Sequence, residues 1–325
     1  MSEELVTTTP PVDFPLGPFT PHPGNPILRP QGSGWESASV YNPAAVVRDD
    51  QVVLLYRAHA HDLVSHVGLA TSDDGVEFER LPEPVMSPSE SYDEFGCEDP
   101  RVTEVDGTYY LTYTGWDRKN ALLCLATSQD LLSWTKHGPI FPDFNTFLPQ
   151  GNGIPGPWSK AGAILDRPVD GRYLMYFGEG SIYHAWSEDL LHWTPCSNDE
   201  PLMVPTGPGT FGEFLVEVGP QPLVTRNGLL LLLHNAAVKY DDGTVRYSCG
   251  QILVDPRRPG EVMAQMSHPW LEPSTHEDLN GLVSNVTFVE GLVHHRDAWF
   301  AYYGQSDSTL GVAVHRAGGT YGALR

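Results

Sequence analysis

A five-fold internal repeat constrains the fold of this chain more than any other feature of its 325 residues. Each copy has a short extended segment, a turn, and a strand of alternating apolar residues that ends near Tyr, Gly or His. The copies recur at intervals of about 60 residues, without a heptad or helical period between them. The paired segments are residues 41–45 with 53–57, 98–101 with 109–115, 159–163 with 173–179, 217–220 with 229–234, and 285–288 with 299–304.

A second pattern follows three of the copies and consists of a small-residue strand, a serine, an acidic turn and an aromatic residue. It occurs at residues 67–78, 123–134 and 182–193, and residues 310–314 carry a shortened version. Segments such as Ser72-Asp73-Asp74-Gly75 have the composition of a calcium loop but lack its ligand spacing. The sequence therefore predicts turns at these places and no metal site.

Five similar units, each long enough for four antiparallel strands, predict an all-β chain folded as a five-bladed β-propeller around a central channel. A β-sandwich is the alternative, but it would not repeat the same first and last residues at one interval. The 32 glycines and 29 prolines agree with many short strands and turns. We therefore expect residues 1–325 to form a single propeller domain, with residues 1–30 as an N-terminal arm.

The charged residues of the repeats are expected to meet at one end of the channel. The first strand of each blade lines the channel, and the far ends of the third strands return to the same mouth. Lys160 and His234 fit a hydrogen-bonded polar core equally well. The residues expected at the mouth are Asn42, Arg57, Glu98, Asp99, Arg101, Lys160, Glu179, Glu217, His234, Asn285 and Asp307, ringed by Tyr41, Trp116, Trp158 and Tyr303.

These side chains together have the chemistry of a sugar site, because cations and amides bind hydroxyl groups and aromatic rings stack on sugars. Cleavage of a glycosidic bond needs a proton donor for the leaving oxygen and a nucleophile on the opposite face. Asp99 is the candidate acid, and Glu179 or Glu217 is the candidate base. The plainer interpretation is that Asp99 closes a turn and that the glutamates form ion pairs with Lys160 or Arg57.

Composition excludes several classes of partner. A formal net charge of −22 repels nucleic acids and anionic lipid surfaces. No stretch approaches the ~18 apolar residues of a spanning helix, and the opening Met1-Ser2-Glu3-Glu4 lacks the features of an export signal. We expect a cytoplasmic protein without nucleic-acid or membrane partners. The four cysteines are widely spaced, without a C-x-x-C pair, which favours reduced thiols.

The residues described above resemble glycoside hydrolase family 130, whose members are five-bladed propellers that act on β-mannosides. The resemblance covers nearly the whole chain. It rests most on residues 96–101, on Asn42-Pro43-Ala44 with Tyr56-Arg57, on the repeated Leu-Ala-Thr-Ser segments, and on residues 285–291. It implies a small oligosaccharide substrate. It also implies that Asp99 is the general acid, which protonates the glycosidic oxygen through a sugar hydroxyl with inversion at the anomeric carbon.

The resemblance also bears on the choice between hydrolysis and phosphorolysis. Most members of the family hold inorganic phosphate with basic residues, whereas a smaller group are hydrolases in which glutamates replace part of that basic set. Phe177-Gly178-Glu179 stands where the phosphorylases carry His-Arg, and Glu217 likewise resembles the hydrolases, although Lys160 and His234 match phosphorylase positions. Two carboxylates would repel a phosphate dianion. We therefore predict an inverting exo-β-mannosidase acting on β-1,2-linked mannosides, without a cofactor.

Two other functions stay open at this stage. A β-mannoside phosphorylase would take inorganic phosphate as co-substrate, hold it with Arg57, Lys160 and His234, and release mannose 1-phosphate. A non-catalytic propeller would use the same carboxylates only to accept hydrogen bonds from sugar hydroxyls. Members of the family form monomers, dimers and hexamers, so the resemblance is compatible with a homo-oligomer in which residues 1–30 form a contact arm.

Overall fold

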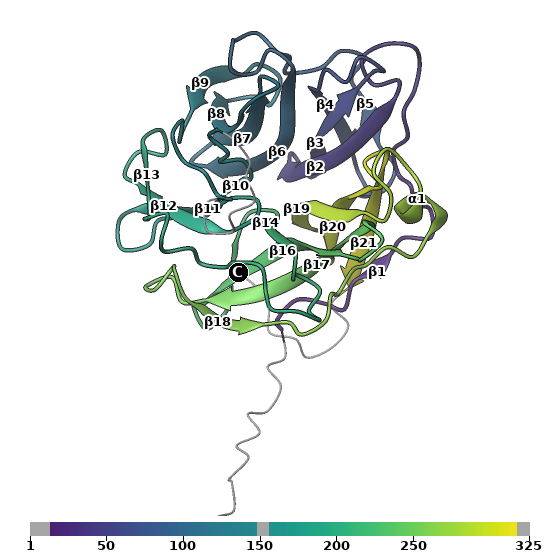
Figure 1. Cartoon of the computed structure of the whole chain (residues 1–325). Coiled ribbons are helices and arrows are strands. Elements are labelled where there is room, and N and C mark those ends of the chain that lie inside the picture. Colours follow the sequence, from purple (N-terminus) through teal and green to yellow (C-terminus); the bar gives the residue numbers. More distant parts are fainter. Residues whose placement is uncertain (1–13, 148–155, 317–325) are drawn as a thin grey trace, which may run out of the picture.

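The computed structural model describes residues 14–147 and 156–316. Within these ranges the strands form five antiparallel sheets, which follow one another around a central axis (Figure 1). The predicted all-β, five-bladed propeller is confirmed.

Each blade begins with its innermost strand and proceeds outward. The first blade contains β2 (Ser39–Arg48), β3 (Gln51–His59), β4 (His66–Ser72) and β5 (Glu79–Arg80), and the second contains β6 (Gly96–Val105), β7 (Thr108–Trp116), β8 (Ala121–Ser128) and β9 (Thr135–Pro139). The third contains β10 (Gly162–Ile164), β11 (Tyr173–Phe177), β12 (Tyr183–Ser187) and β13 (Trp193–Pro195). The fourth contains β14 (Leu215–Val218), β16 (Leu230–Lys239), β17 (Val245–Val254) and β18 (Val262–Gln265), and β15 (Leu223–Val224) also pairs with β16.

The fifth blade combines the two ends of the described chain. It contains β19 (Thr287–His295), β20 (Ala298–Gln305), β21 (Thr309–Arg316) and, outermost, β1 (Thr20–Pro21). Pro21 is tolerated there because an edge strand needs no further backbone donor. Residues 14–30 of the predicted arm thus pack on the chain's own fifth blade, whereas its residues 1–13 lie outside the described residues. A short helix, α1 (His276–Leu279), lies between the fourth and fifth blades in sequence.

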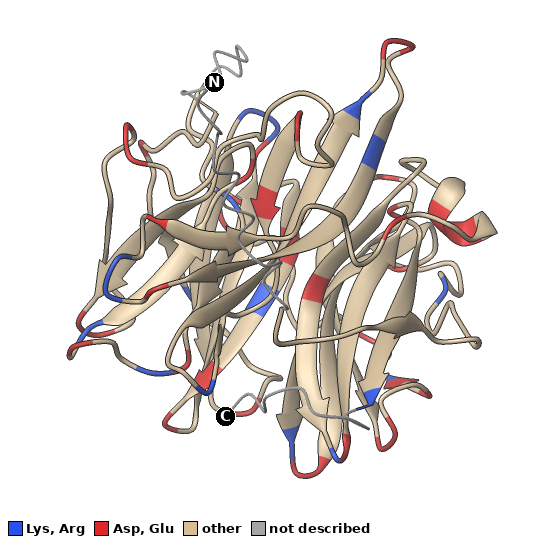
Figure 2. Ribbon diagram, turned by 90° about the horizontal axis from the view of Figure 1, so that it is seen from below, with Lys and Arg blue, Asp and Glu red and all other residues tan. Residues whose placement is uncertain are grey.

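The blades pack through apolar side chains on both faces of each sheet. On β3, Leu54 and Tyr56 belong to one core cluster together with Tyr302 of the fifth blade, while Leu55 packs with Leu111 of the second. Successive side chains of a strand point to opposite faces, so alternate residues meet alternate neighbours. This packing leaves most charged side chains in the loops at the strand ends, and Figure 2 shows only a few on strands in the interior.

Irregular pairing on three innermost strands turns polar residues toward the axis. The register shifts between Tyr41 and Pro43 on β2, between Glu98 and Arg101 on β6, and between Val289 and Gly291 on β19. A bulge of this kind re-aims a side chain that regular pairing would send between the sheets. The residues at the three bulges are Asn42, Asp99 with Pro100, and Glu290; Asn42 and Asp99 each have a φ of 49°.

One detail of the predicted arrangement is wrong. Arg57 lies on β3, Glu179 lies two residues after β11, and Asp307 lies two residues after β20, so these residues lie on or just after the second strand of each blade and not the third. The innermost strand and the second strand form a hairpin, as the pairing of Tyr41 with Arg57 shows. The start of one strand and the end of the next therefore lie side by side at the mouth.

Candidate active site at the channel mouth

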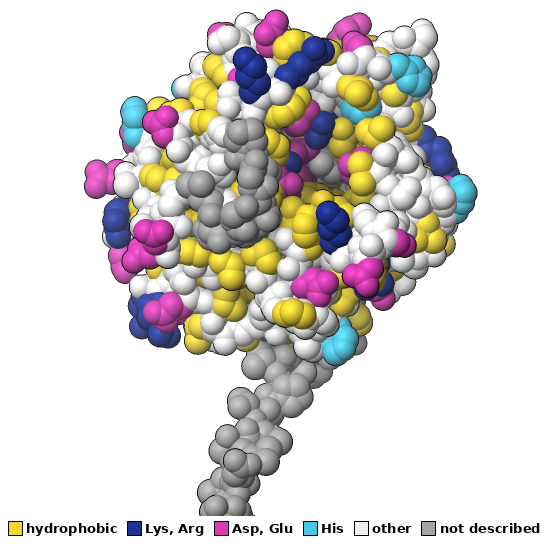
Figure 3. Space-filling model, viewed as in Figure 1, with side chains coloured by type: hydrophobic (Ala, Val, Ile, Leu, Met, Phe, Trp, Pro, Cys, Tyr) yellow, Lys and Arg dark blue, Asp and Glu magenta, His cyan; other side chains and the backbone are white. Residues whose placement is uncertain are grey.

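A cavity of about 150 Å³ opens on the propeller axis. In Figure 3 a hollow near the centre of the visible face has basic and acidic side chains at its base and hydrophobic ones beside it. Most of the polar residues predicted for the mouth line this cavity. Its lining residues are Asn42, Arg57, Asp99, Lys160, Glu179, Glu217, Tyr247, Val283, Val286, Phe288 and Asp307.

Asp99 is the most strongly held carboxylate of the cavity. Its Oδ1 accepts hydrogen bonds from Asn42 Nδ2 and Arg57 Nη1, both at 2.8 Å, and its Oδ2 lies 2.9 Å from Lys160 Nζ. Burial by itself would raise the pKa of Asp99, but Lys160 and Arg57 outweigh burial and hold that pKa well below its usual range. Asp99 is therefore ionised in the substrate-free protein.

Lys160 places one ammonium group among three carboxyl groups. Besides Asp99, its Nζ lies 3.8 Å from Glu179 Oε2 and 3.9 Å from Glu217 Oε1. Burial opposes the charge, but Asp99 and then Glu179 raise the pKa of Lys160 well above its ordinary value. The Lys160 ammonium thus brings the carboxyl groups of Asp99, Glu179 and Glu217 together in one part of the cavity.

The two candidate bases lie side by side but in different surroundings. Glu179 and Glu217 form an isolated antiparallel β-bridge that joins the third and fourth blades. Glu179 Oε2 accepts a 2.6 Å hydrogen bond from Trp158 Nε1, which fixes the carboxylate at the rim. Glu217 is buried, and burial raises its pKa to about 8 although Lys160 opposes the rise. Burial therefore favours the protonated form of Glu217.

Arg57 is fixed from several sides before any substrate binds. Its Nη2 donates to Glu98 Oε1 at 2.6 Å, its Nε donates to Ser65 Oγ at 2.9 Å, and its guanidinium lies 4.7 Å from the centre of the Tyr41 ring. Glu98, predicted to bind substrate, does not line the cavity, because its carboxylate is turned toward Arg57 and Ser65. The structure therefore makes Glu98 and Tyr41 supports for Arg57.

Arg101 lies beneath the cavity and does not line it. Its guanidinium donates to the carbonyl oxygens of Asp99 at 3.0 Å and Val218 at 2.8 Å. Its Nη2 also lies 3.4 Å from Glu217 Oε1 and 3.1 Å from Glu290 Oε1. Arg101 was predicted as a substrate contact, but these bonds make it a tie between the second, fourth and fifth blades.

Three other predicted residues lie apart from the cavity. His234 is buried among the apolar side chains between the third and fourth blades, with its ring centre 5.9 Å from that of Phe211, and burial lowers its pKa to about 4. Tyr303 is buried in the core of the fifth blade, where its hydroxyl accepts a hydrogen bond from Asn25. Asn285 does not line the cavity, and its carbonyl oxygen accepts a hydrogen bond from the Tyr247 N–H.

One wall of the cavity was not predicted from the sequence and is apolar. It consists of Tyr247 from β17, Val283 from the loop after α1, Val286, and Phe288 from β19. Val286 and Phe288 alternate within the fifth repeat, which is the one signal that pointed to them. Tyr247 lies on a third strand and Val283 in a loop, outside the repeated segments.

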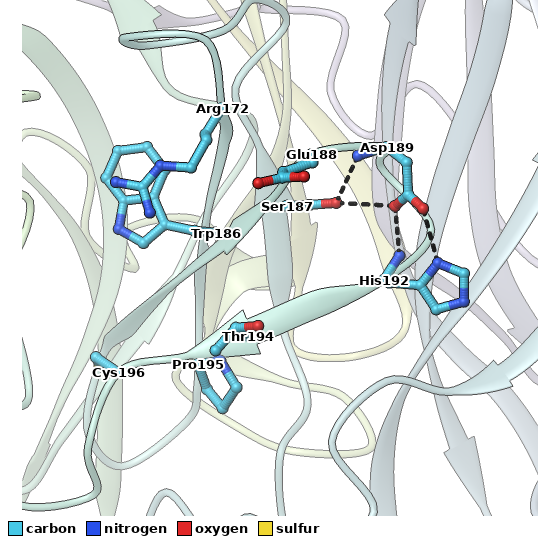
Figure 4. A pocket seen from close by; sticks show the side chains of 9 residues that line it. All are labelled: Arg172, Trp186, Ser187, Glu188, Asp189, His192, Thr194, Pro195 and Cys196. Atoms are coloured by element: carbon cyan, nitrogen blue, oxygen red, sulfur yellow. Dashed lines mark hydrogen bonds and ion pairs between the residues drawn. The ribbon is translucent and has the colours of Figure 1, made fainter.

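A second pocket, of about 430 Å³, lies on the outer strands of the third blade (Figure 4). There Asp189 accepts hydrogen bonds from the two backbone N–H groups that follow Leu190, and Arg172 lies 4.5 Å from the centre of the Trp186 ring. Asp74 and Asp130 form the same turn in the first two blades, so the predicted turns are confirmed. The lining residues are Arg172, Trp186, Ser187, Glu188, Asp189, His192, Thr194, Pro195 and Cys196.

Residues 14–147 and 156–316 contain no group of three or more His, Cys, Asp or Glu side chains that could hold a metal ion. None of the helices in these ranges is long and apolar enough to cross a membrane.

Comparison with known proteins defines the class of enzyme. The sequence pattern of glycoside hydrolase family 130, described as beta-1,4-mannooligosaccharide phosphorylase, matches residues 24–317. A 1,2-beta-oligomannan phosphorylase from Thermoanaerobacter sp. (strain X514) is 33% identical over 301 residues, which cover 89% of this chain and 94% of that protein. A beta-1,2-mannobiose phosphorylase from the same organism is 32% identical, over 89% of this chain and 94% of that protein.

Solved structures agree with this comparison. A putative glycoside hydrolase from Parabacteroides distasonis superposes with a TM-score of 0.84 at 32% identity, over 92% of this chain and 96% of the other. Another structure, with a TM-score of 0.83, 32% identity and coverage of 94% and 95%, is described with glycoside hydrolases of the GH130 family that target β-1,2 mannosidic linkages in Candida mannan. Fold and site thus define a glycoside-active propeller enzyme. The chain belongs to glycoside hydrolase family 130, which confirms the resemblance seen in the sequence.

Proposed function

We propose that this enzyme hydrolyses β-1,2-linked mannosides from one end of the substrate, with inversion at the anomeric carbon. The observation that carries the proposal is the charge of the cavity. Among the described lining residues the cations are Arg57 and Lys160, and both already form ion pairs with carboxylates. A phosphate dianion would have to compete with these pairs and approach Glu179 and Glu217, whereas a water molecule meets no such repulsion.

The size of the cavity supports an exo-acting enzyme. Its volume of about 150 Å³ is small beside the roughly 300–1,000 Å³ of pockets that enclose drug-sized ligands. One terminal sugar ring is therefore the unit that the cavity accepts. The apolar side chains that line the cavity suit the C–H face of that ring, while the polar lining residues offer hydrogen-bonding groups to its hydroxyls.

Opposite pKa shifts of Asp99 and Glu217 provide the acid and the base of the proposed reaction. Asp99 is ionised and Glu217 holds a proton, and the Lys160 ammonium lies between them. A sugar hydroxyl that enters between Asp99 and Lys160 weakens their ion pair and raises the proton affinity of Asp99. Transfer of the proton from Glu217 to Asp99 then produces a protonated acid and an ionised base in one step.

The remaining steps restore the starting state. Asp99 delivers its proton to the glycosidic oxygen through the sugar hydroxyl, and the bond between that oxygen and the anomeric carbon breaks. Glu217 takes a proton from the water that attacks the opposite face of the sugar. Asp99 ends ionised and Glu217 ends protonated, as both began. Glu179, fixed by Trp158, accepts a hydrogen bond from the attacking water.

Phosphorolysis is the second candidate, and the names of relatives favour it. Proteins that are 33% and 32% identical to this chain are described as phosphorylases of β-1,2-linked mannosides. The experiment that separates the two reactions is incubation with β-1,2-mannobiose, with and without millimolar phosphate, followed by separation of mannose from mannose 1-phosphate. Hydrolysis predicts free mannose at the same rate in both samples. Mannose 1-phosphate formed only with phosphate would overturn the proposal.

A further inference from the structure

Glu290 is a fully buried carboxyl group that the proposed mechanism does not use. It sits at the bulge of β19, and its side chain has a relative exposure of 0%. At this bulge the backbone of β19 approaches β2 closely, since a Cβ atom on Gly291 would lie 2.7 Å from the Pro43 carbonyl oxygen and 3.0 Å from the Ala45 Cβ. The other two bulges on innermost strands present Asn42 and Asp99 to the cavity. Glu290 is presented to Arg101 beneath it.

The surroundings of Glu290 provide little to stabilise a negative charge. No described donor makes a hydrogen bond to either of its carboxyl oxygens, and its one ion contact is Arg101 Nη2 at 3.1 Å. That nitrogen also lies 3.4 Å from Glu217 Oε1 and donates to the Val218 carbonyl oxygen. Glu217 has a second cation, Lys160, at 3.9 Å. Of the two carboxyl groups at Arg101, Glu290 is thus the poorer site for a charge.

Charged groups on neighbouring strands both raise and lower the pKa of Glu290. Arg101 and Asp99 face Glu290 from β6, Glu217 faces it from β14, and Lys160 faces it from the segment before β10. Burial is the largest influence and raises the pKa of Glu290 well above its ordinary value; Arg101 opposes burial, and Asp99 reinforces it. On its own strand, Val289 and Gly291 carry no charge.

We propose that Glu290 is a positioning residue that stays protonated, so that Arg101 is free to form its ion pair with Glu217. When Glu217 gives up its proton in the proposed mechanism, Arg101 is the buried cation that balances it. An ionised Glu290 would compete with Glu217 for the same guanidinium nitrogen of Arg101. A neutral carboxyl group fills the space beside Arg101 without forming an ion pair with it. The kinetic part of this inference rests on the proposed role of Glu217.

The first test needs no substrate and is therefore independent of the proposed function. Wild-type protein and Glu290→Gln are unfolded in urea at several pH values between 5 and 8. A carboxyl that is protonated when folded and ionised when unfolded contributes stability that is lost as the pH rises above its unfolded pKa. The wild-type unfolding constant should therefore rise about tenfold per pH unit relative to Glu290→Gln, which cannot titrate. A pH-independent ratio would overturn the proposal.

A matched control and a second readout complete this test. Glu83 is an exposed carboxyl, and Glu83→Gln should give a ratio to wild type that does not change with pH. If Glu290→Gln does not fold, carboxyl ¹³C NMR of labelled wild-type protein replaces it. One glutamate resonance should stay at the protonated chemical shift at pH 9, where Glu217 has ionised. Its absence would also overturn the proposal.

The positioning role is tested by comparing two substitutions. Glu290→Ala removes the group that packs beside Arg101, so kcat should fall at least ~10-fold with little change in KM. Glu290→Gln, which keeps the shape and the neutrality, should recover most of the lost kcat. Equal losses in both variants would mean that the charge of Glu290 is needed. The comparison uses whichever acceptor, water or phosphate, the wild-type enzyme proves to use, so it holds even if hydrolysis does not.

Discussion

Raising the pH through 8 removes the proton that the proposed reaction requires. Burial raises the pKa of Glu217 to about 8, and the free enzyme carries its transferable proton on this residue. Above that value the protonated fraction falls tenfold per pH unit, so kcat/KM should fall about tenfold from pH 9 to pH 10. The sign is specific, because a glutamate that had to start as an ionised base would make kcat/KM rise through the same range.

The assay is the initial rate of mannose release from β-1,2-mannobiose well below KM, where the rate reports the free enzyme. Glu217→Gln should lower kcat/KM at least ~10²-fold and remove the fall above pH 8. Glu188→Gln, which changes an exposed carboxyl far from the axis, is the matched control and should keep the wild-type profile. A kcat/KM that increases between pH 7 and pH 9 in the wild type would refute the reasoning.

Three further predictions concern individual residues of the cavity. Asp99→Asn should lower turnover at least ~10²-fold while calorimetry still detects sugar binding. Near-normal turnover of this variant would remove Asp99 from the mechanism. A wild-type protein that binds the sugar but shows no turnover would favour a non-catalytic propeller. Burial raises the pKa of Asp307 to about 6. KM should therefore increase below pH 6, because this hydrogen-bond acceptor gains a proton there. Asp307→Asn should show a high KM that does not change with pH. Trp158→Phe removes the 2.6 Å hydrogen bond to Glu179 and should lower kcat about 10-fold with a smaller change in KM; an unchanged kcat would mean that Glu179 needs no such support.

Much of this arrangement could be predicted from the sequence, because the repeat indicates the propeller fold and also contains most of the residues that line the cavity. A propeller places equivalent strand ends at one mouth, so Asn42, Asp99, Lys160 and Glu217 could be brought together without coordinates. The N-terminal segment was harder to place. Thr20 and Pro21 form too short a strand to produce an alternating pattern, and only their pairing with β21 reveals that they close the fifth blade.

The misplaced residues share one physical cause, which is the direction of a side chain on its strand. His234 lies on the second strand of the fourth blade, as Arg57 does in the first, yet its ring points between two blades whereas Arg57 points to the axis. A shift of one residue in register exchanges these faces. The bulge at Asp99 causes such a shift on β6, which carries Glu98 and Arg101, whereas the pairing of β16 around His234 is regular; the repeat pattern reveals neither fact.

The ionisation states also lay beyond sequence reasoning. Asp99 resembles the general acid of its family, yet in the free protein two cations hold it ionised. Glu217 was proposed as a base, yet burial raises its pKa to about 8 and favours its protonated form. The first result depends on the distances from Asp99 to Lys160 and Arg57, and the second on the burial of Glu217; sequence spacing provides neither.

The measurement that tests the central claim most directly is ¹H NMR of the cleavage of the methyl glycoside of β-1,2-mannobiose, recorded in phosphate-free buffer from the first minutes of reaction. Its blocked reducing end ensures that all the free mannose comes from the sugar whose glycosidic bond is cleaved. An inverting hydrolase should release α-mannose first, and the β anomer should appear only as mutarotation proceeds. No cleavage until phosphate is added, or β-mannose as the first product, would contradict the account.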